Sequence, residues 1–300
     1  MCQPYGIVLC GGGAKGAYQM GVLKALEEKG YLNNIFGISG VSIGALNALA
    51  ISCCGTDIGI EMWDEINPSV VFDTDITMID GTEGLFSRQK MRELLYRYIK
   101  FEKIQQTTYP IYVTTAPVEA SGCLVEYFKI NDKSKDEIVT LMEATSALPI
   151  IYKDVDFDGV KYRDGGICDN MPIRPLYDLG CREFFVLSLS NEATINQIAF
   201  PDARFHLLRP YKDLGGLLTG TLNFSKEDIQ MNLKLGYKDG IRYVKAYLEG
   251  DTLISDHYDL YATMDYDSVA LEMRQQEMQK SIDSKFEYIA NLEKKYNIDF

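Results

Sequence analysis

Histidine is scarce in this sequence, because among 300 residues only His206 and His257 could supply an imidazole. Cysteine pairing signals are also missing, since the seven cysteines include no C-x-x-C pair of the kind that binds zinc. Their odd number and wide scatter predict a reduced, intracellular set rather than a disulfide framework. We therefore expect a cytoplasmic protein.

Positive charge is in short supply as well. Lysine and arginine total 30 against 43 aspartate and glutamate residues, which gives a net charge of −13. A nucleic-acid partner would require a basic footprint, so we expect no nucleic-acid partner. The acidic balance also argues against bulk attraction to anionic membranes, which leaves transient contact with a membrane surface through a local patch.

Long apolar runs, targeting signals and metal motifs are absent too. No apolar run approaches 18 residues, so we expect no segment to span a bilayer. The first residues lack the basic region and the long apolar stretch of a signal peptide. No loop carries the spaced carboxylates of a calcium site, and we expect neither a metal nor a cofactor. The absence of repeats and low-complexity linkers favours one domain.

Apolar residues make up 46% of the chain, enough for a substantial core. Within it, G-V-S-I-G at residues 40–44 stands between a short apolar run, residues 34–38, and an apolar helical run, residues 45–51. A strand, a tight turn with a serine and a helix are typical of a nucleophile elbow. Ser42 would then project at the head of a helix, whose positive end favours developing negative charge. The alternative is an ordinary helix-capping serine.

A second glycine-rich stretch, G-G-G-A-K-G at residues 11–16, follows an apolar strand predicted at residues 5–10 and opens a helix. It also satisfies G-x-G-x-x-G, so a Rossmann-type nucleotide site is an alternative. That site requires an acidic residue at the end of the second strand, and residues 38–42 contain none. The loop could instead present backbone N–H groups to an anion. Parallel pairing of the two strands would place it beside Ser42.

The third glycine-flanked stretch is D-G-G at residues 164–166. It follows a hairpin predicted from two β-rich runs, residues 150–155 and 160–162. Functional side chains often lie in such turns, held by the strand below. The alternative is a purely structural turn, because Asp-Gly is common in turns.

Taken together, these three motifs resemble those of the patatin-like phospholipase family of lipid acyl hydrolases. A-T-S-A-L-P at residues 144–149 is similar to the A-S-x-A-x-P segment of that family. Several ordered motifs are a more specific signal than any one of them. The resemblance implies a three-layer α/β fold, with a central, mostly parallel sheet flanked by helices and a helical C-terminal extension. Residues 5–190 would form the catalytic domain, and residues 191–300 would be a mainly helical region packed on it.

The resemblance also implies a serine–aspartate dyad that hydrolyses a lipid or a small ester. Ser42 would attack the ester carbonyl and Asp164 would accept its proton. Backbone N–H groups of the glycine loop would form the oxyanion hole. The hole would comprise Gly11, Gly12 and Gly13, and the residues supporting the motifs would be Lys15, Gly16, Gly40, Gly44, Gly165 and Gly166.

Other interpretations stay open at this stage. Both histidines follow Asp164, so a Ser–Asp–His order is formally possible, although in the α/β-hydrolase plan the elbow follows several strands rather than the second. The scaffold could bind lipid without catalysis, or the glycine loop could bind a nucleotide. Lys15 could meet a substrate phosphate, or it could pack within the loop.

The remaining segments give weaker signals. An irregular stretch at residues 70–86 is interpreted as a lid or binding loop, or as a packed connector. After a strand predicted at residues 183–190 the pattern becomes helical, with one helix at residues 228–248. The stretch from Met278 to Tyr296 is amphipathic, and we expect it to pack back on the core rather than to contact a membrane or a partner.

Overall fold

The computed structural model describes residues 4–72, 88–119, 122–149 and 151–296. Most of the stretch interpreted as a lid or connector, residues 70–86, therefore lies outside the described residues. Within the described part, eight strands form one sheet. They are β1 (Tyr5–Leu9), β2 (Ile35–Val41), β3 (Ile111–Pro117), β4 (Glu126–Lys129), β5 (Val155–Phe157), β6 (Val160–Asp164), β7 (Glu183–Leu187) and β8 (Arg204–Leu208).

The strand order is β5-β6-β3-β2-β1-β7-β8. The remaining strand, β4, pairs with β3, which also pairs with β6. The five strands β3, β2, β1, β7 and β8 are parallel, whereas β4, β5 and β6 pair antiparallel. The predicted α/β class with a mostly parallel sheet is confirmed. The sequence analysis missed β8, because this short edge strand has few apolar residues that alternate clearly.

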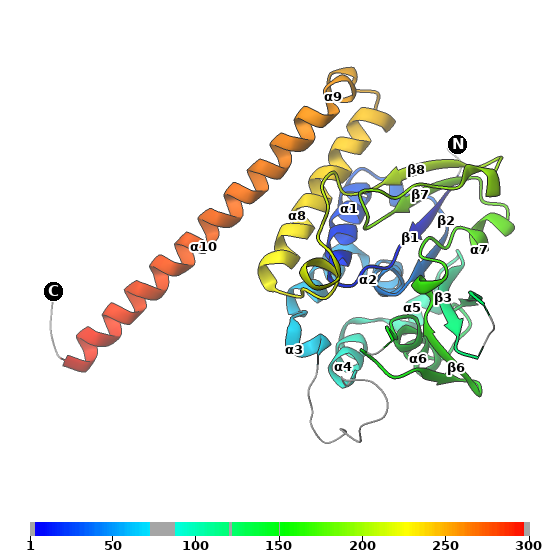
Figure 1. Cartoon of the computed structure of the whole chain (residues 1–300), viewed down its shortest axis with the longest axis horizontal. Helices are drawn as coiled ribbons and strands as arrows, with labels where there is room; N and C mark the ends of the chain where they lie inside the picture. The colour runs from blue at the N-terminus through cyan, green and yellow to red at the C-terminus, as the bar shows by residue number, and fades with distance from the viewer. Residues whose placement is uncertain (1–3, 73–87, 120–121, 150, 297–300) are drawn as a thin grey trace.

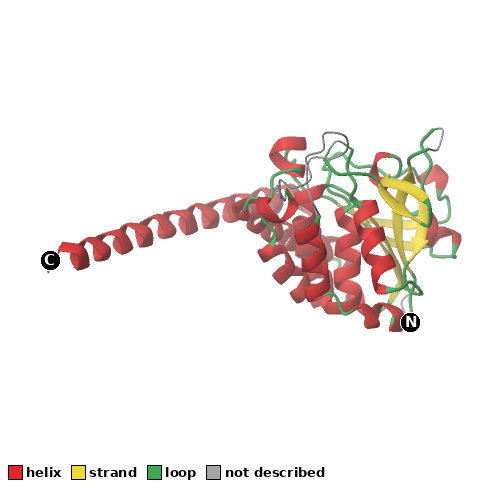
Figure 2. Ribbon diagram, turned by 90° about the horizontal axis from the view of Figure 1, so that it is seen from below, coloured by secondary structure: helices red, strands yellow, loops and turns green. Residues whose placement is uncertain are grey.

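Helices cover both faces of the sheet (Figure 1). They are α1 (Gly16–Glu28), α2 (Ile43–Glu65), α3 (Pro68–Val71), α4 (Gln89–Tyr98), α5 (Phe101–Gln106), α6 (Lys135–Thr145), α7 (Arg174–Asp178), α8 (Lys226–Tyr243), α9 (Thr252–Asp256) and α10 (Tyr258–Tyr296). Side chains of β1 alternate between two cores: Ile7 and Leu9 pack with the α1 and α2 side, while Val8 packs with Leu176 of α7. Most of the helical mass lies on one side of the sheet (Figure 2).

Helix α2 is the one described helix that is long and apolar enough, by length and composition alone, to cross a membrane. The sequence analysis had expected no such segment. In the structure, however, 56% of its most apolar window is buried inside the protein. Ala45, Ala48 and Leu49 belong to the main core. A kink at Gly55, which has a φ of 81°, also divides the helix. These features are those of a core helix.

Helix α10 departs from the predicted arrangement. Its first part packs on α8, but the rest leaves the body of the protein as a long projection (Figures 1 and 2). Met278, Ile282, Phe286 and Ile289 are exposed by 64%, 39%, 67% and 44%. The expectation that these side chains pack on the core was therefore wrong. Amphipathic spacing predicts a helix with an apolar face, but it does not identify what covers that face.

Candidate active site

Ser42 lies in the sharp turn between β2 and α2. Its backbone angles, φ 54° and ψ −130°, are unusual for a residue with a side chain. Strain of this kind is found at functional turns and persists only where the surroundings impose it. Gly44 helps to impose it, because a Cβ at this position would lie 2.2 Å from the Leu9 carbonyl oxygen. The structure thus contains the strand–turn–helix geometry that G-V-S-I-G predicted.

Thr145 holds this turn from behind. The Ser42 N–H donates to Thr145 Oγ1 at 2.9 Å, and the Thr145 hydroxyl donates to the Thr114 carbonyl oxygen at 2.6 Å. In the same segment the Ala147 carbonyl oxygen accepts a hydrogen bond from the Asp164 N–H at 3.0 Å. The A-T-S-A-L-P segment therefore fixes both the serine turn and the aspartate turn through backbone and hydroxyl contacts.

Asp164 is 2% exposed and lies at the end of β6, where η4 (Gly165–Ile167) begins. Burial raises the pKa of its carboxyl from 3.8 to about 6. Hydrogen bonds from the Ser42 hydroxyl and the Gly166 N–H oppose this rise in pKa, the latter at 2.8 Å. A smaller lowering of the pKa comes from the positive charge of Arg88. The fold thus brings Ser42 and Asp164 together, as the sequence predicted.

The glycine loop runs beside Ser42, since a Cβ at Gly11 would lie 3.1 Å from the Ser42 Cβ. The Gly11 N–H is engaged, because it donates to Asn170 Oδ1 at 2.9 Å, and the Asn170 amide donates back to the Gly11 carbonyl oxygen. In the described part of the chain, the N–H groups of Gly12 and Gly13 have no acceptor. These two groups are therefore the ones available to an anion.

Gly13 adopts a φ of 58° and begins η1 (Gly13–Lys15). A Cβ there would lie 2.1 Å from the Thr221 carbonyl oxygen in η6 (Leu217–Thr221). The predicted supporting residues lie around these turns. Gly16 begins α1, Gly40 lies in β2, Gly44 lies in the first turn of α2, and Gly165 and Gly166 lie in η4. Lys15 packs with its Cε against the backbone at Gly220, which agrees with a packing role.

A cavity opens beside Ser42 and Gly13. The space within it that the centre of a water molecule can reach is about 100 Å³. Its walls are mainly apolar and are contributed by α1, α2, α3, α4, by residues 148, 151 and 152, and by the segment at residues 221–224. The lining includes Met20, Leu46, Trp63, Leu95, Leu148 and Phe224. A site with such apolar walls suits an aliphatic chain.

Buried polar side chains beneath the loop fix its two ends. Gln19 donates to the carbonyl oxygens of Cys10 and Leu187 at 2.7 Å and 2.9 Å. Asn47 donates to the Gly16 carbonyl oxygen at 3.0 Å. The sequence analysis missed Gln19, Asn47 and Asn170, and it singled out Thr145 only as part of the A-T-S-A-L-P segment, without a role. Gln19 and Asn47 could have been identified from the sequence, because each is a polar residue within an otherwise apolar helical run.

The alternative chemistries find no support in this geometry. His206 lies on β8 between Glu183 and Tyr243, and His257 contacts the Leu253 carbonyl oxygen. Neither imidazole contacts Ser42 or Asp164, so the histidine triad is wrong. Among the described residues, no group of three or more His, Cys, Asp or Glu side chains is arranged to hold a metal ion.

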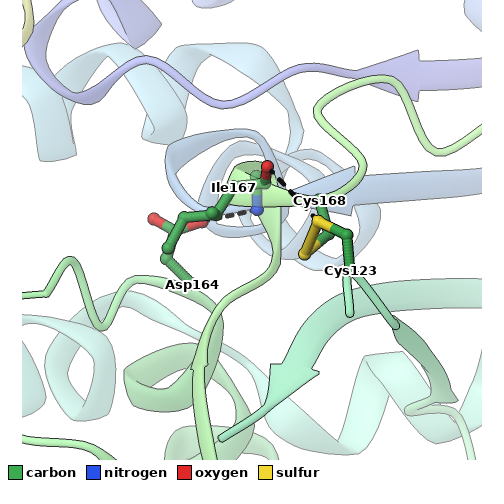
Figure 3. The surroundings of a disulfide bond; sticks show 5 residues. Cys123, Asp164, Ile167 and Cys168 are labelled. Carbon is green, nitrogen blue, oxygen red and sulfur yellow. Dashed lines mark hydrogen bonds between the residues drawn. A yellow bond between two sulfur atoms is a disulfide. The ribbon is translucent and has the colours of Figure 1, made fainter. Parts of the chain in front are cut away.

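A disulfide joins the aspartate turn to the β3–β4 hairpin (Figure 3). It links Cys168, four residues after Asp164, to Cys123. The expectation of a wholly reduced cysteine set was therefore wrong. The two cysteines are 45 residues apart, and they meet because β3 pairs with both β4 and β6. The hairpin contacts the turn a second time, since the Tyr127 hydroxyl donates to Asp169 at 2.7 Å.

Removing this disulfide should destabilise the protein. Closing a loop of this length restricts the unfolded chain by about 3–4 kcal/mol. We expect Cys123→Ala combined with Cys168→Ala to lower the free energy of unfolding by that amount in urea titrations without reductant. Dithiothreitol should lower the wild type to the same value and leave the double variant unchanged. If dithiothreitol leaves the free energy of unfolding of the wild type unchanged, the disulfide does not contribute to stability.

Thr145→Val should impair turnover more than binding. The change keeps the shape but leaves the Ser42 N–H without its acceptor and removes the hydroxyl's hydrogen bond to the Thr114 carbonyl oxygen, which costs about 2 kcal/mol of stability. Because the serine turn loses its support, we expect kcat on a soluble ester to fall about tenfold with KM nearly unchanged. Thr145→Ser retains both hydrogen bonds and should restore kcat. Loss of stability with normal kcat would mean that Thr145 has a structural role only.

Comparisons with known proteins were made for the whole chain. The model of a family described as patatin-like phospholipase matches residues 7–177. Patatin-like phospholipase domain-containing protein 7 of Mus musculus is 24% identical over 265 residues, which cover 87% of this chain and 19% of that protein. A probable lipid hydrolase of invertebrate iridescent virus 6 is 25% identical over 181 residues, covering 56% of this chain and 61% of the viral protein.

The chain thus spans about a fifth of the length of the mouse protein. Among solved structures, VipD from Legionella pneumophila matches with a TM-score of 0.49 and 12% identity, over 95% of this chain and 77% of that one.

Proposed function

Because the chain belongs to the patatin-like phospholipase family, we propose that it is a lipid acyl hydrolase in which Ser42 forms an acyl-enzyme and Asp164 is the general base. The observation that carries this proposal is that the fold places the Ser42 hydroxyl beside the buried Asp164 carboxyl, whose pKa this hydroxyl lowers. The strained serine turn, the free N–H groups of the glycine loop and the apolar cavity support it.

In the first half of the reaction, Ser42 Oγ attacks the ester carbonyl carbon while Asp164 takes the hydroxyl proton. The carbonyl oxygen becomes an oxyanion, and as the tetrahedral intermediate collapses the leaving alcohol departs with the proton from Asp164. In the second half water attacks the acyl-enzyme with the same base, and the acid is released. A carboxyl with a pKa of about 6 is a stronger base than an exposed aspartate.

The oxyanion would be held by the N–H groups of Gly12 and Gly13. Preorganised donors of this type are worth roughly 3 to 4 kcal/mol each in the transition state. The Gly11 N–H, which is bound to Asn170, would instead keep the loop in place. The proposed oxyanion hole therefore has two N–H donors, from Gly12 and Gly13, and not the three that the sequence suggested.

The acyl chain would occupy the apolar cavity beside Ser42. Each methylene moved from water into an apolar site contributes about 0.8 kcal/mol. We therefore expect kcat/KM for p-nitrophenyl esters to rise about fourfold per added methylene until the cavity is filled. Leu95→Gln, which places an amide in the cavity wall, should flatten this series while leaving acetate hydrolysis similar. If kcat/KM of the wild type does not depend on chain length, the acyl chain does not bind in this cavity.

The proposed function can be tested with purified protein and mixed micelles of phospholipid, lysophospholipid and monoacylglycerol. We expect release of free fatty acid from at least one of them, and covalent labelling by a fluorophosphonate that blocks this release. Tight lipid binding with neither release nor labelling would instead identify a non-catalytic lipid-binding protein. The panel also ranks the lipid classes, because all of them present the same carbonyl to Ser42.

A further inference from the structure

The stretch from residue 164 to residue 170 connects the two halves of the proposed catalytic machinery, and we call it the coupling segment. Asp164 begins it, and its carboxyl accepts a hydrogen bond from the Gly166 N–H at 2.8 Å. Asn170 ends it and binds Gly11 in both directions, with 2.9 Å between the Gly11 nitrogen and Asn170 Oδ1. A movement of the coupling segment would therefore displace the general base and the anchor of the glycine loop together.

The Cys123–Cys168 disulfide ties the coupling segment to the loop between β3 and β4. Figure 3 shows Asp164 and Cys168 at opposite ends of the same turn. The second polar contact between the hairpin and the segment is the hydrogen bond from Tyr127 to Asp169. With the disulfide open, this hydrogen bond is the polar contact that remains between them among the described residues. The disulfide thus restrains the end of the segment that lies away from the base.

Solvent reaches this disulfide. Cys123 is exposed and Cys168 is half-buried, and the neighbouring Ile167 is 54% exposed. Most of the free cysteines in the described part of the chain are instead buried. Thiol–disulfide exchange begins when a thiolate attacks one of the two sulfur atoms, so access decides whether it can occur. Cys123 is therefore the residue at which an external thiol can attack.

From this arrangement we propose that the Cys123–Cys168 disulfide is a thiol–disulfide exchange site that controls the hydrolase, which is fast with the bond closed and slow after a dithiol has opened it. The proposal rests on the proposed function, which assigns the dyad to Ser42 and Asp164. It adds that the coupling segment holds the base correctly only while the disulfide restrains it.

The exchange proceeds in two steps. A thiolate of the dithiol attacks Cys123 Sγ, which forms a mixed disulfide and releases Cys168 as a thiolate that takes a proton from water. The second thiol of the reagent then attacks the mixed disulfide, and Cys123 leaves and is protonated in turn. The products are two protein thiols and one oxidised dithiol, so two electrons and two protons have passed to the protein.

Opening the bond should slow turnover without unfolding the chain. The start of the segment stays in place, because β6 pairs with β3 and β5 and the Asp164 N–H donates to the Ala147 carbonyl oxygen at 3.0 Å. The rest of the segment gains freedom, and misplacing a reacting group by about 1 Å can cost about 10²-fold in rate. We expect kcat to fall about tenfold with KM nearly unchanged, since the residues lining the acyl cavity lie outside the segment. The hydrolase would then be slow in a compartment that reduces thiols and fast in an oxidising one.

The test compares the full chain before and after reduction by dithiothreitol, with kcat and KM measured on a soluble ester and thiols counted by mass after maleimide labelling. We expect two more labelled thiols, a kcat lower by about tenfold, and recovery when oxidised dithiothreitol closes the bond. Cys123→Ser combined with Cys168→Ser should have the kcat of the reduced chain and should not respond to dithiothreitol.

The matched control is Cys54→Ala. Hydrogen bonding from the Cys53 thiol lowers the pKa of the half-buried Cys54 thiol to about 6, so this is the free cysteine most open to side reactions. Cys54→Ala should keep the full response to dithiothreitol. Loss of the response in this variant would assign the effect to Cys54 and overturn the proposal.

Three results with the wild type would also overturn the proposal. These are no gain of labelled thiols, an unchanged kcat once both thiols are free, and loss of far-ultraviolet circular dichroism on reduction, which would make the bond purely structural. If the oxidised chain neither hydrolyses esters nor takes a fluorophosphonate label, the proposed function fails instead. Hydrogen exchange of residues 164–170 then decides on the coupling: faster exchange in the reduced chain supports it, and equal exchange contradicts it.

Discussion

Ser42→Ala should reduce ester hydrolysis by at least about 10⁴-fold, because the attacking oxygen is removed and water must react without an acyl-enzyme. Fluorophosphonate labelling should disappear in the same variant. The backbone turn is kept, so the N–H groups of Gly12 and Gly13 remain in place and weak substrate binding should persist. The measurement is kcat/KM on a soluble ester, together with the dissociation constant for a lipid.

The chain offers a matched control in Ser146. This serine also lines the cavity, but its hydroxyl donates to the Met142 carbonyl oxygen within α6. Ser146→Ala should leave kcat/KM within a few-fold of the wild type. Ser42→Gly should be as inactive as Ser42→Ala yet more stable by about 1 kcal/mol, because glycine tolerates a φ of 54°. Activity retained in Ser42→Ala would disprove the nucleophile.

The sequence predicted the elements around the site well. Each glycine-flanked motif lies where a strand ends, and turn chemistry is local, so the strand–turn–helix at residue 42 and the hairpin ending at residue 164 could be recognised without coordinates. The first strand of that hairpin was misplaced, however, because it is β5 at Val155–Phe157 and not residues 150–155. The cap of α6 is equally local, since Ser134 and Glu137 form a reciprocal capping box. The family resemblance then supplied the pairing of the motifs, which no local pattern contains.

The contacts that hold the site could not be predicted in this way. Thr145 reaches the Ser42 N–H across 103 residues, and Asn170 reaches Gly11 across 159. Such pairings depend on how the strands are ordered in the sheet, and spacing along the chain does not encode that order. The disulfide between Cys123 and Cys168 was missed for the same reason. The exposed apolar face of α10 was missed because periodicity predicts that a helix has an apolar face but does not tell whether another element packs on it.

Asp164→Asn should lower kcat/KM by about 10²–10⁴-fold, the usual contribution of a general base, because an amide cannot accept the serine proton. The Gly166 N–H can still donate to the side-chain oxygen, so the turn should keep its shape. In the wild type, kcat/KM should increase tenfold per pH unit below about pH 6 and level off above it, following ionisation of a carboxyl with a pKa of about 6. A loss smaller than tenfold would contradict the assignment.

The same substitution should stabilise the protein at neutral pH. The pKa of Asp164 is about 6 in the folded protein against 3.8 in the unfolded chain, so ionising the carboxyl costs more in the fold. Wild-type stability should therefore be highest below about pH 4, fall as pH rises to about 6, and level off above that. The full difference is about 3 kcal/mol, since each pKa unit corresponds to about 1.4 kcal/mol. Urea titrations of Asp164→Asn should lack this fall, so the variant should match the wild type near pH 4 and exceed it at pH 8. Equal stabilities at pH 8 would show that burial does not raise the pKa of Asp164, and its carboxylate would then be no stronger a base than an exposed aspartate.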